Sequence, residues 1–380
     1  MKFTIKRDAL NTAIQHVSKA ISGRTTIPIL GGIKVTADHD AVTLTASDQT
    51  LSIQSRIALD TAIGTLGEVQ TTGSIVLPAK FLIEIVKKLP KDEVVVEVNG
   101  LNARIVSGKS EIDMAGMDPE EFPQLPNIRK TDTLAIPSDQ LVELINSTAF
   151  AVSTNESTPV LNGVLMALSD GKLQFRATDR HRLASHSIKI ESDLRLSNII
   201  IAGKSLLDLA KVLPDKSAPV DILIADNQAL FRFGNILFYS RLLEGTFPDT
   251  SKIIPHEFKT EVVIDTKLIN DAIDRAYLLS REEKTNIVRL ATIEEDGSEG
   301  IEIMSSSTQI GKVLEQLPVK DFIGEQLKVA FNSKYVLDAL KVIDSEETFV
   351  GFNGPMSPII IKPNGSEDAL HLVLPYRTTN

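Results

Sequence analysis

The sequence predicts an α+β protein made of three tandem, similar domains, each with two helices on one side of antiparallel sheets. An amphipathic helix pattern occurs three times, over Pro78–Leu89, Ala202–Leu213 and Asn332–Ile343. The strand-then-helix pattern that begins the chain returns twice, and the stretches between show the two-residue period of antiparallel strands. Runs of strands with few helices favour a sheet whose helices lie on one face, so we expect this arrangement three times.

Matching residues set the length of the repeat. The strand-then-helix segment Phe3–Ile21 resembles Leu134–Val152, and a weaker third copy begins at Val262. Further strands are predicted over 42–49, 92–98, 219–225 and 358–363. Three matched pairs lie 131 positions apart: Leu10 and Leu141, Pro28 and Pro159, Asp48 and Asp179. We therefore expect domains over residues 1–127, 128–255 and 256–380.

Composition narrows the class of protein. A chain of 380 residues exceeds the size at which single hydrophobic cores stop growing, and 42% hydrophobic with 24% charged residues is typical of globular proteins. The absence of cysteine excludes disulfides and thiolate metal sites and favours the cytosol. No apolar run approaches a membrane span, so no membrane partner is expected. The net charge of −10 argues against binding to nucleic acid only if the basic side chains are scattered over the surface.

Each copy of the repeated helix carries a lysine in its first turn, an acid four residues later and a second lysine after three more. A lysine near a helix N-terminus meets the positive end of the helix dipole, which costs about 0.3–1 kcal/mol. Three repetitions of that cost favour lysines that face a negative partner, although a solvated face of lysine–acid pairs is the alternative. The three sets are Lys80/Glu84/Lys87, Lys204/Asp208/Lys211 and Lys334/Asp338/Lys341.

Motifs for catalysis are not found in the sequence. The tripeptide Gly-Lys-Ser occurs twice, but Ala103 and Asn198 stand where a phosphate-binding loop needs glycine. The six histidines form no metal-ligand pair at helical spacing. Asp48 and Asp179 are equivalent in the repeat, so we expect them to stabilise turns. Nothing predicts catalysis, a metal or a cofactor.

The stretch Thr178–Leu183 is the most unusual part of the second repeat. Compared with Ser47–Ser52 in the first repeat, it has gained two arginines and a histidine. These side chains either bond to neighbouring carbonyls or form a site that only the second domain has.

Four short segments together resemble one family over the whole chain: Ala-Thr-Asp-Arg-His-Arg-Leu at 177–183, Leu-Asn-Gly at 161–163, Gly-Thr-Phe-Pro-Asp at 245–249 and Leu-Pro-Tyr-Arg at 374–377. They resemble the bacterial DNA polymerase III β subunits, the sliding clamps. The resemblance implies a DNA-clamp fold, a ring-shaped head-to-tail homodimer around double-stranded DNA, and a cytoplasmic, nucleoid-associated processivity factor that is not an enzyme. It also implies that polymerase is tethered without sequence-specific contact to DNA.

The resemblance further implies a pocket for short apolar peptide motifs between the second and third domains. Its expected partners are the DNA polymerase III α subunit, the clamp loader, other polymerases, and mismatch-repair or ligase proteins. Leucines and Ile253 would form apolar walls, while Arg182 and Arg377 would donate hydrogen bonds to the peptide. Arg180, Lys252 and Tyr376 depart from common family residues. The implied pocket residues are Leu161, Thr178, His181, Arg182, Leu183, Pro248, Lys252, Ile253, Pro358, Leu372, Leu374, Pro375, Tyr376 and Arg377.

Two further surfaces are expected. The dimer contact implied by the resemblance involves Ile112, Leu278 and Leu279, although ordinary core positions are the alternative. The DNA-facing candidates combine the repeated lysines with two arginines: Arg7, Arg24, Lys80, Lys87, Lys204, Lys211, Lys334 and Lys341. Two other functions stay open from the residues alone, namely a three-domain scaffold whose lysine faces meet another protein, and a phosphate-handling enzyme with an unrecognised site.

Overall fold

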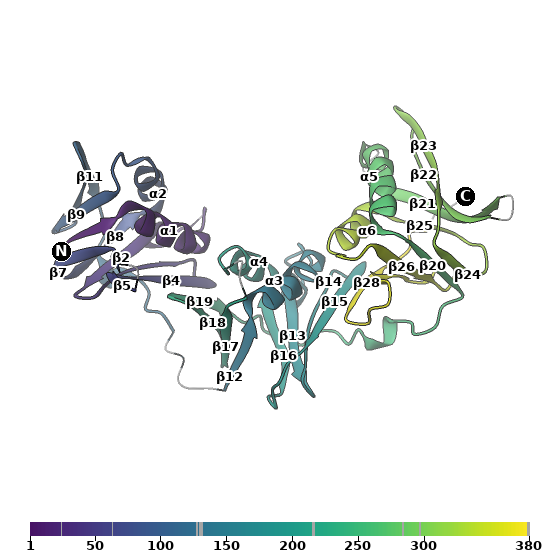
Figure 1. The fold of residues 1–380 in the computed structure, drawn as a ribbon, viewed down its shortest axis with the longest axis horizontal. Helices are drawn as coiled ribbons and strands as arrows, with labels where there is room; N and C mark the ends of the chain where they lie inside the picture. Colours follow the sequence, from purple (N-terminus) through teal and green to yellow (C-terminus); the bar gives the residue numbers. More distant parts are fainter. Residues whose placement is uncertain are drawn as a thin grey trace. The chain divides into compact units, whose positions relative to one another are not determined.

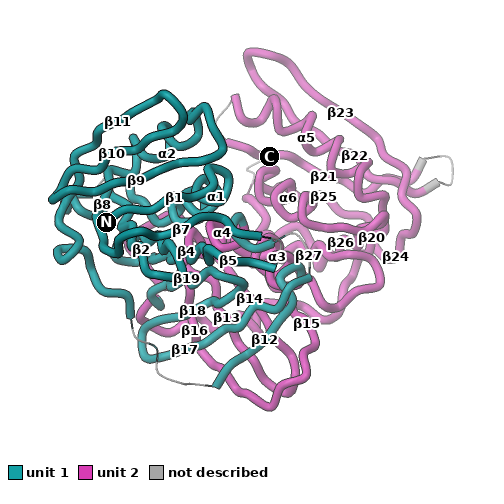
Figure 2. Tube along the Cα trace, turned by 60° about the vertical axis from the view of Figure 1, so that its left-hand side comes forward, with its two compact units in different colours: residues 1–139, 211–242 teal, residues 140–210, 243–380 magenta. Residues whose placement is uncertain are grey.

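The computed structural model describes residues 1–23, 25–62, 64–126, 128, 132–214, 217–282, 285–295 and 298–377. The chain divides into two compact units, shown in Figure 2. Unit 1 contains residues 1–139 and 211–242, and unit 2 contains residues 140–210 and 243–380. Each unit is described separately below.

The described residues form six α-helices, two for each predicted repeat (Figure 1). The three lysine-bearing helices are shorter than the patterns predict, since α4 ends at Ala210 and α6 ends at Leu340. At the start of α6, the side chain of Asn332 accepts a hydrogen bond from the amide of Lys334 and caps the helix. The helices are α1 (Arg7–Val17), α2 (Ala79–Lys88), α3 (Ser138–Asn146), α4 (Gly203–Ala210), α5 (Thr266–Glu282) and α6 (Ser333–Leu340).

Unit 1 contains two large antiparallel sheets. A five-stranded sheet has the order β11–β10–β9–β1–β7, with β11 at one edge. An eight-stranded sheet has the order β12–β17–β18–β19–β4–β3–β2–β8. The strands are β1 (Lys2–Lys6), β2 (Gly32–Asp38), β3 (Ala41–Ser47), β4 (Leu51–Ala58), β7 (Gly67–Thr71), β8 (Gly73–Pro78), β9 (Glu93–Asn99), β10 (Asn102–Ser107), β11 (Ser110–Ala115), β12 (Thr133–Pro137), β17 (Pro219–Ala225), β18 (Gln228–Phe233) and β19 (Ile236–Arg241), with the short pair β5 (Asp60–Thr61) and β6 (Gly64–Thr65) beside them.

Unit 2 also contains two antiparallel sheets. A nine-stranded sheet has the order β16–β13–β14–β15–β28–β27–β26–β20–β24, and a four-stranded sheet has the order β23–β22–β21–β25. The strands are β13 (Gly163–Ser169), β14 (Lys172–Thr178), β15 (Arg182–Lys189), β16 (Leu196–Ala202), β20 (Thr260–Asp265), β21 (Ile287–Glu295), β22 (Ser298–Ser307), β23 (Gly311–Pro318), β24 (Asp321–Gly324), β25 (Lys328–Asn332), β26 (Glu347–Phe352), β27 (Ile359–Pro363) and β28 (Ala369–Val373).

The strand orders confirm the threefold repeat. Each repeat gives one four-stranded set, β4–β3–β2–β8, β15–β14–β13–β16 or β23–β22–β21–β25, and a second set, β11–β10–β9–β1, β19–β18–β17–β12 or β28–β27–β26–β20. Where two repeats meet, the outer strand of the first set of one repeat pairs with the outer strand of the second set of the next repeat. In this way β4 pairs with β19 and β15 pairs with β28, both antiparallel.

This pairing explains why the compact units do not coincide with the three predicted domains. The second repeat contributes β17–β19 to the sheet of the first repeat, and β13–β16 to the sheet of the third. Backbone hydrogen bonds therefore cross the expected boundaries, and domains over 1–127, 128–255 and 256–380 stay a prediction.

The cores lie where helices cover sheets. In unit 1, α1 packs on β3 and β4 and buries Leu10, Ile14 and Val17. In unit 2, α5 lies beside α6 and packs on β20–β23, with Ile273 and Phe331 in the buried cluster between them (Figure 1). The helices keep their apolar stripes inward, so their polar faces are available to solvent.

Candidate functional site

The turn between β14 and β15 forms the centre of the candidate peptide pocket in unit 2. The carboxylate Oδ1 of Asp179 accepts hydrogen bonds from the amides of His181 (2.9 Å) and Arg182 (3.0 Å), and Arg180 has a φ of 76°. The hydroxyl of Thr178 donates to the carbonyl of Arg182 across the turn, at 2.6 Å. The predicted turn role of Asp179 is confirmed, because this bonding fixes the loop that presents His181.

An apolar floor lies beside this turn. Leu183 on β15 is directly opposite Leu372 on β28, and both are almost fully buried, in a cluster with Ile360. Leu161 is also buried, in the short 3₁₀ helix η5 (Pro159–Asn162). These leucines are held by packing within unit 2, so they form a rigid base for a ligand.

Exposed apolar side chains lie in the same unit as the floor. Ile253, Leu374 and Tyr376 are 45%, 38% and 53% exposed. The chain after β28 is fixed by two backbone bonds, from the amide of Leu374 to the carbonyl of His181 and from the amide of Tyr376 to the carbonyl of Ala330. The remaining predicted members lie in the same unit, with Pro248, Lys252 and Arg377 exposed and Pro358 and Pro375 half-buried.

Arg182 bonds within the protein, which is one of the two alternatives that the sequence leaves open. Its Nε donates to Asp179 at 3.0 Å, its Nη1 to Asp338 at 2.7 Å and its Nη2 to the carbonyl of Phe150 at 2.7 Å. The guanidinium also lies 4.6 Å from the ring centroid of Tyr335 and is only 10% exposed. The donors expected to hold a peptide are therefore engaged within the protein, and Arg182 positions the turn against α6.

Sequence reasoning missed the residues that engage Arg182. Asp338 and Tyr335 lie on α6, far along the chain from β15, and no local pattern connects them. The ring of His181 stacks on that of Tyr335, with centroids 6.5 Å apart. Asp338 belongs to the polar stripe of the repeated helix, and its position two residues before the end of α6 does not indicate an inward partner.

The lysines of the three repeated helices are exposed. Lys80 and Lys87 lie on α2, Lys204 lies on α4 and Lys211 follows it, and Lys334 lies on α6 with Lys341 just beyond its end. Their acids differ from one another: Glu84 pairs with Lys88 at 3.1 Å, Asp208 is buried, and Asp338 contacts Arg182. In the third triplet, Lys334 pairs with its own acid, Asp338, at 3.7 Å.

Of the two arginines among the DNA-facing candidates, only Arg7 belongs to the described residues. Arg7 begins α1, pairs with Asp8 at 3.0 Å and donates from Nη1 to the carbonyl of Leu89 after α2, at 3.1 Å. It therefore joins the two helices of its repeat while remaining partly exposed. Arg24 lies outside the described residues.

The predicted dimer residues lie on or near edge strands. Ile112 is half-buried on β11, the outer strand of its sheet in unit 1. On α5 of unit 2, Leu278 is 46% exposed and Leu279 is half-buried. Near them, the outer strand β23 carries Leu314, which is 53% exposed. An exposed apolar edge strand favours pairing with another strand.

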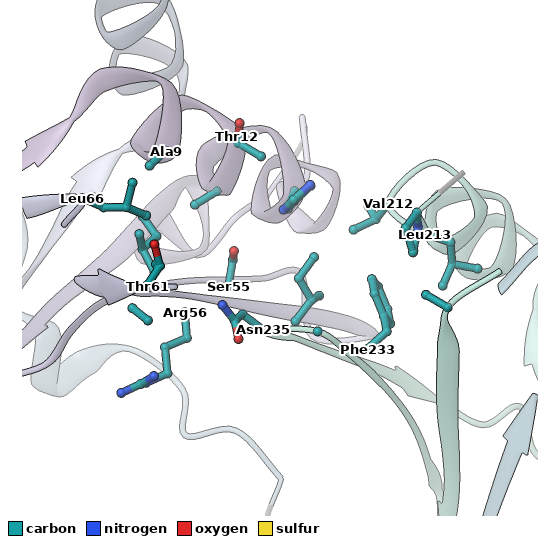
Figure 3. A pocket seen from close by; sticks show the side chains of 18 of the residues that line it. Ala9, Thr12, Ser55, Arg56, Thr61, Leu66, Val212, Leu213, Phe233 and Asn235 are labelled. Atoms are coloured by element: carbon teal, nitrogen blue, oxygen red, sulfur yellow. The ribbon is translucent and has the colours of Figure 1, made fainter. Parts of the chain in front are cut away.

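The cavity in Figure 3 lies in unit 1 between α1, β4 and the segment after α4, with a volume of about 930 Å³. Thr12 of α1 and Phe233 of β18 point toward it, whereas Arg56 points away (Figure 3). Arg56 pairs with Asp40, and burial lowers the pKa of His16, so its ring is neutral at pH 7. No group of three or more potential metal ligands occurs among the described residues, and no described helix is long and apolar enough to cross a membrane.

Comparisons with known proteins agree with this geometry. Sequence profiles for the N-terminal, central and C-terminal domains of the DNA polymerase III beta subunit match residues 1–126, 135–249 and 251–377. The beta sliding clamps of Halalkalibacterium halodurans and Bacillus subtilis are 44% and 45% identical, over all of this chain and all of theirs.

Solved structures give the same result. The crystal structure of the DNA polymerase sliding clamp from Bacillus subtilis matches with a TM-score of 0.95 and 44% identity, over 100% of this chain and 99% of that one. The beta subunit from DNA polymerase of Streptococcus pyogenes matches with a TM-score of 0.92 and 32% identity, over all of both chains. The repeat, the strand order and these matches together show that the chain belongs to the family of DNA polymerase III β subunits, the β sliding clamps.

Proposed function

We propose that two copies of this chain join head to tail into a closed ring around duplex DNA. The observation that carries this proposal is the strand order. Where two repeats of this chain meet, the outer strand of a first set pairs with the outer strand of a second set. Two such outer strands, β23 of a first set in unit 2 and β11 of a second set in unit 1, have no strand on their outer side among the described residues. A second copy that follows the same rule pairs its β11 with this β23, and two such joins close the assembly.

The side chains at these edges support the pairing. Leu314 on β23 and Leu278 on α5 expose apolar surface, and Ile112 on β11 is only half-buried. Each edge also carries an exposed charge of opposite sign, Lys312 on β23 and Glu111 on β11, which could pair across the joined strands. Pairing would bury apolar surface at about 25 cal/mol per Å² and would satisfy backbone groups that otherwise invite aggregation.

As a member of this family, the chain is a non-catalytic processivity factor of DNA polymerase. We infer that the exposed lysines of α2, α4 and α6 face the phosphates of the enclosed duplex. Flexible lysines that reach only phosphates hold DNA without reading bases, so the ring can slide. Retention then depends on enclosure, and the excess of acidic residues elsewhere on the chain does not oppose it.

We further propose that the pocket beside the 178–183 turn holds short apolar motifs of partner proteins. The buried leucine floor and the exposed Ile253, Leu374 and Tyr376 support this role, because a partner side chain would remove them from water. The proposed partners are the DNA polymerase III α subunit, the clamp loader, other polymerases, and mismatch-repair or ligase proteins. The place of action is the cytoplasm, with the nucleoid.

Sedimentation equilibrium of the full chain tests the ring. We expect a dimer at micromolar concentration, because an interface of paired strands and apolar side chains is typical of stable assemblies. A monomer at that concentration would overturn the ring and would favour the alternative of a monomeric scaffold.

A further inference from the structure

A second pocket lies in unit 1, at the end of the β3–β4 hairpin, with a volume of about 270 Å³. Its walls come from this hairpin, from the short 3₁₀ helix η2 (Pro28–Gly31), from residues 121–126 and from β18 and β19. Every lining residue belongs to unit 1. No role assigned above uses this pocket.

The backbone at this pocket repeats that of the peptide pocket in unit 2. The carboxylate Oδ1 of Asp48 accepts from the amides of Thr50 (3.0 Å) and Leu51 (2.8 Å), as Asp179 does in its own turn. Gln49 has a φ of 78°, against 76° for Arg180. The glycines that follow η2 and η5 share a φ of −110° and a ψ of 163°. The two sites are therefore copies of one backbone arrangement.

Part of the lining also corresponds position by position. At the repeat distance, four of them match proposed members of the unit 2 pocket: Leu30 with Leu161, Ser47 with Thr178, Thr50 with His181 and Ser52 with Leu183.

The strand register extends the match to the neighbouring strands. Tyr239 lies opposite Ser52 as Leu372 lies opposite Leu183. One strand further on, Leu230 lies opposite Tyr239 as Ile360 lies opposite Leu372. The lining residue Gln228 comes two positions before Leu230, as Pro358 comes two before Ile360.

The chemistry of the copy is different. Ser52, Tyr239 and Gln228 replace two leucines and a proline at the floor, so the floor can hydrogen-bond. Apolar surface remains on one side, where Ile27 is 41% exposed. The lining contains the exposed acid Glu121 and no lysine, arginine or histidine, and no ion pair between described residues includes Glu121.

We propose that unit 1 carries a second docking pocket, whose occupant is a short extended peptide of a partner protein with an apolar side chain next to a lysine or arginine. The apolar residue packs against Ile27 and the cation pairs with Glu121. This proposal rests on the proposed function of the unit 2 pocket, because it takes that site's geometry as its template. The two pockets then select different partners. The unit 2 pocket selects by apolar contact alone, and the unit 1 pocket selects by apolar contact together with an ion pair.

The test uses fluorescence anisotropy with the full-length protein and three labelled peptides. The basic probe is Gly-Ile-Lys-Leu-Gly, its neutral counterpart has Gln in place of Lys, and the apolar probe is Gly-Leu-Ala-Leu-Leu-Gly. Two matched variants block one pocket each, Ile27→Arg in unit 1 and Ile253→Arg in unit 2, since both isoleucines are exposed and neither change disturbs a core. Circular dichroism confirms that each variant is folded.

We expect Ile27→Arg to abolish binding of the basic probe and to leave the apolar probe unchanged, with the opposite pattern for Ile253→Arg. A second variant, Glu121→Gln, should weaken the basic probe about fivefold and leave the neutral peptide unchanged. Binding of the basic probe that is unaffected by Ile27→Arg, or no binding of that probe, overturns the second pocket alone. An apolar probe that is unaffected by Ile253→Arg overturns the proposed unit 2 pocket instead.

Discussion

At the scale of single residues, Arg182 connects the candidate pocket to its support. It joins the carboxylates of Asp179 and Asp338 and stacks on Tyr335, all within unit 2. Replacement by methionine keeps much of the volume but leaves two carboxylates without their common partner. Breaking a buried ion pair in this way costs about 3 kcal/mol, so we expect Arg182→Met to lower the urea midpoint of unfolding and to weaken peptide binding.

The matched control is Arg180→Met, in the same turn. The side chain of Arg180 is exposed, and its guanidinium donates a hydrogen bond to the hydroxyl of Thr158 at 3.3 Å. We expect a change of less than about 0.5 kcal/mol in the free energy of unfolding for this variant. Equal urea midpoints for the two variants would show that the buried network does not stabilise the fold.

His371 makes the stability of unit 2 depend on pH. It is fully buried on β28, neither ring nitrogen has a hydrogen-bond partner among the described residues, and its ring lies 5.7 Å from that of Phe150. Burial, with a smaller effect of the nearby His186, lowers the pKa of His371 to about 3 from 6.5. Between these two values the unfolded chain binds a proton that the folded protein does not, so stability falls as the pH falls below 6.5.

We expect His371→Leu to remove part of this loss. Leucine needs no hydrogen bond, so the variant should be at least as stable as the parent near pH 7. Its advantage should grow by about 2 kcal/mol between pH 6.5 and pH 5, at about 1.4 kcal/mol per pH unit. Urea midpoints measured at both pH values check the prediction. Parallel pH profiles for the two proteins would contradict it. Burial also lowers the pKa of His16 and His186, so some acid sensitivity should remain.

At the scale of elements, the helices α2, α4 and α6 share one feature, an exposed lysine in the first turn. We expect the triple variant Lys80→Glu, Lys204→Glu and Lys334→Glu to weaken DNA binding and to flatten its salt dependence. Each lysine that contacts phosphate contributes about one unit to the slope of log K against log salt. Measurement of binding to duplex DNA over a range of salt concentrations gives this slope.

A control with equal charge separates contact from net charge. Lys109, Lys172 and Lys189 are exposed lysines at strand ends or turns, and none of them lies on these helices. Their triple change to glutamate alters the net charge by the same amount. A slope that falls equally in both triple variants would remove the helix lysines from the DNA-facing set.

The sequence predicts elements well where the signal is local. The repeat distance, the strand-then-helix segments and the turn role of Asp48 and Asp179 follow from neighbouring residues, and all agree with the structure. The inward direction of Asp208 and Asp338 could not be predicted, because an acid on a polar stripe turns inward only where another element supplies a partner. For Asp338, that partner is Arg182, 156 residues away.

At the scale of the whole molecule, the same limit applies to the sheets. The patterns of β4 and β19 indicate two separate strands, but only their backbone pairing shows that the second repeat continues the sheet of the first. Sequence patterns report which face of a strand is buried and not which strand lies beside it. The peptide-pocket residues came from family resemblance for the same reason, since they are gathered from β15, β28 and the loops between repeats.

The proposed ring makes a prediction about the free edges. The variant Leu314→Lys would place a charge where β23 exposes its large apolar side chain, so we expect this variant to be monomeric in sedimentation experiments. The variant should also lose retention on nicked circular DNA after loading by a clamp loader, whereas the parent should be retained until a restriction enzyme linearises the circle. The control is Ile323→Lys on β24, where an isoleucine is 58% exposed on another edge strand of unit 2. A dimeric Leu314→Lys variant would remove β23 from the interface, and retention of the parent on linear DNA would show that attachment does not depend on enclosure.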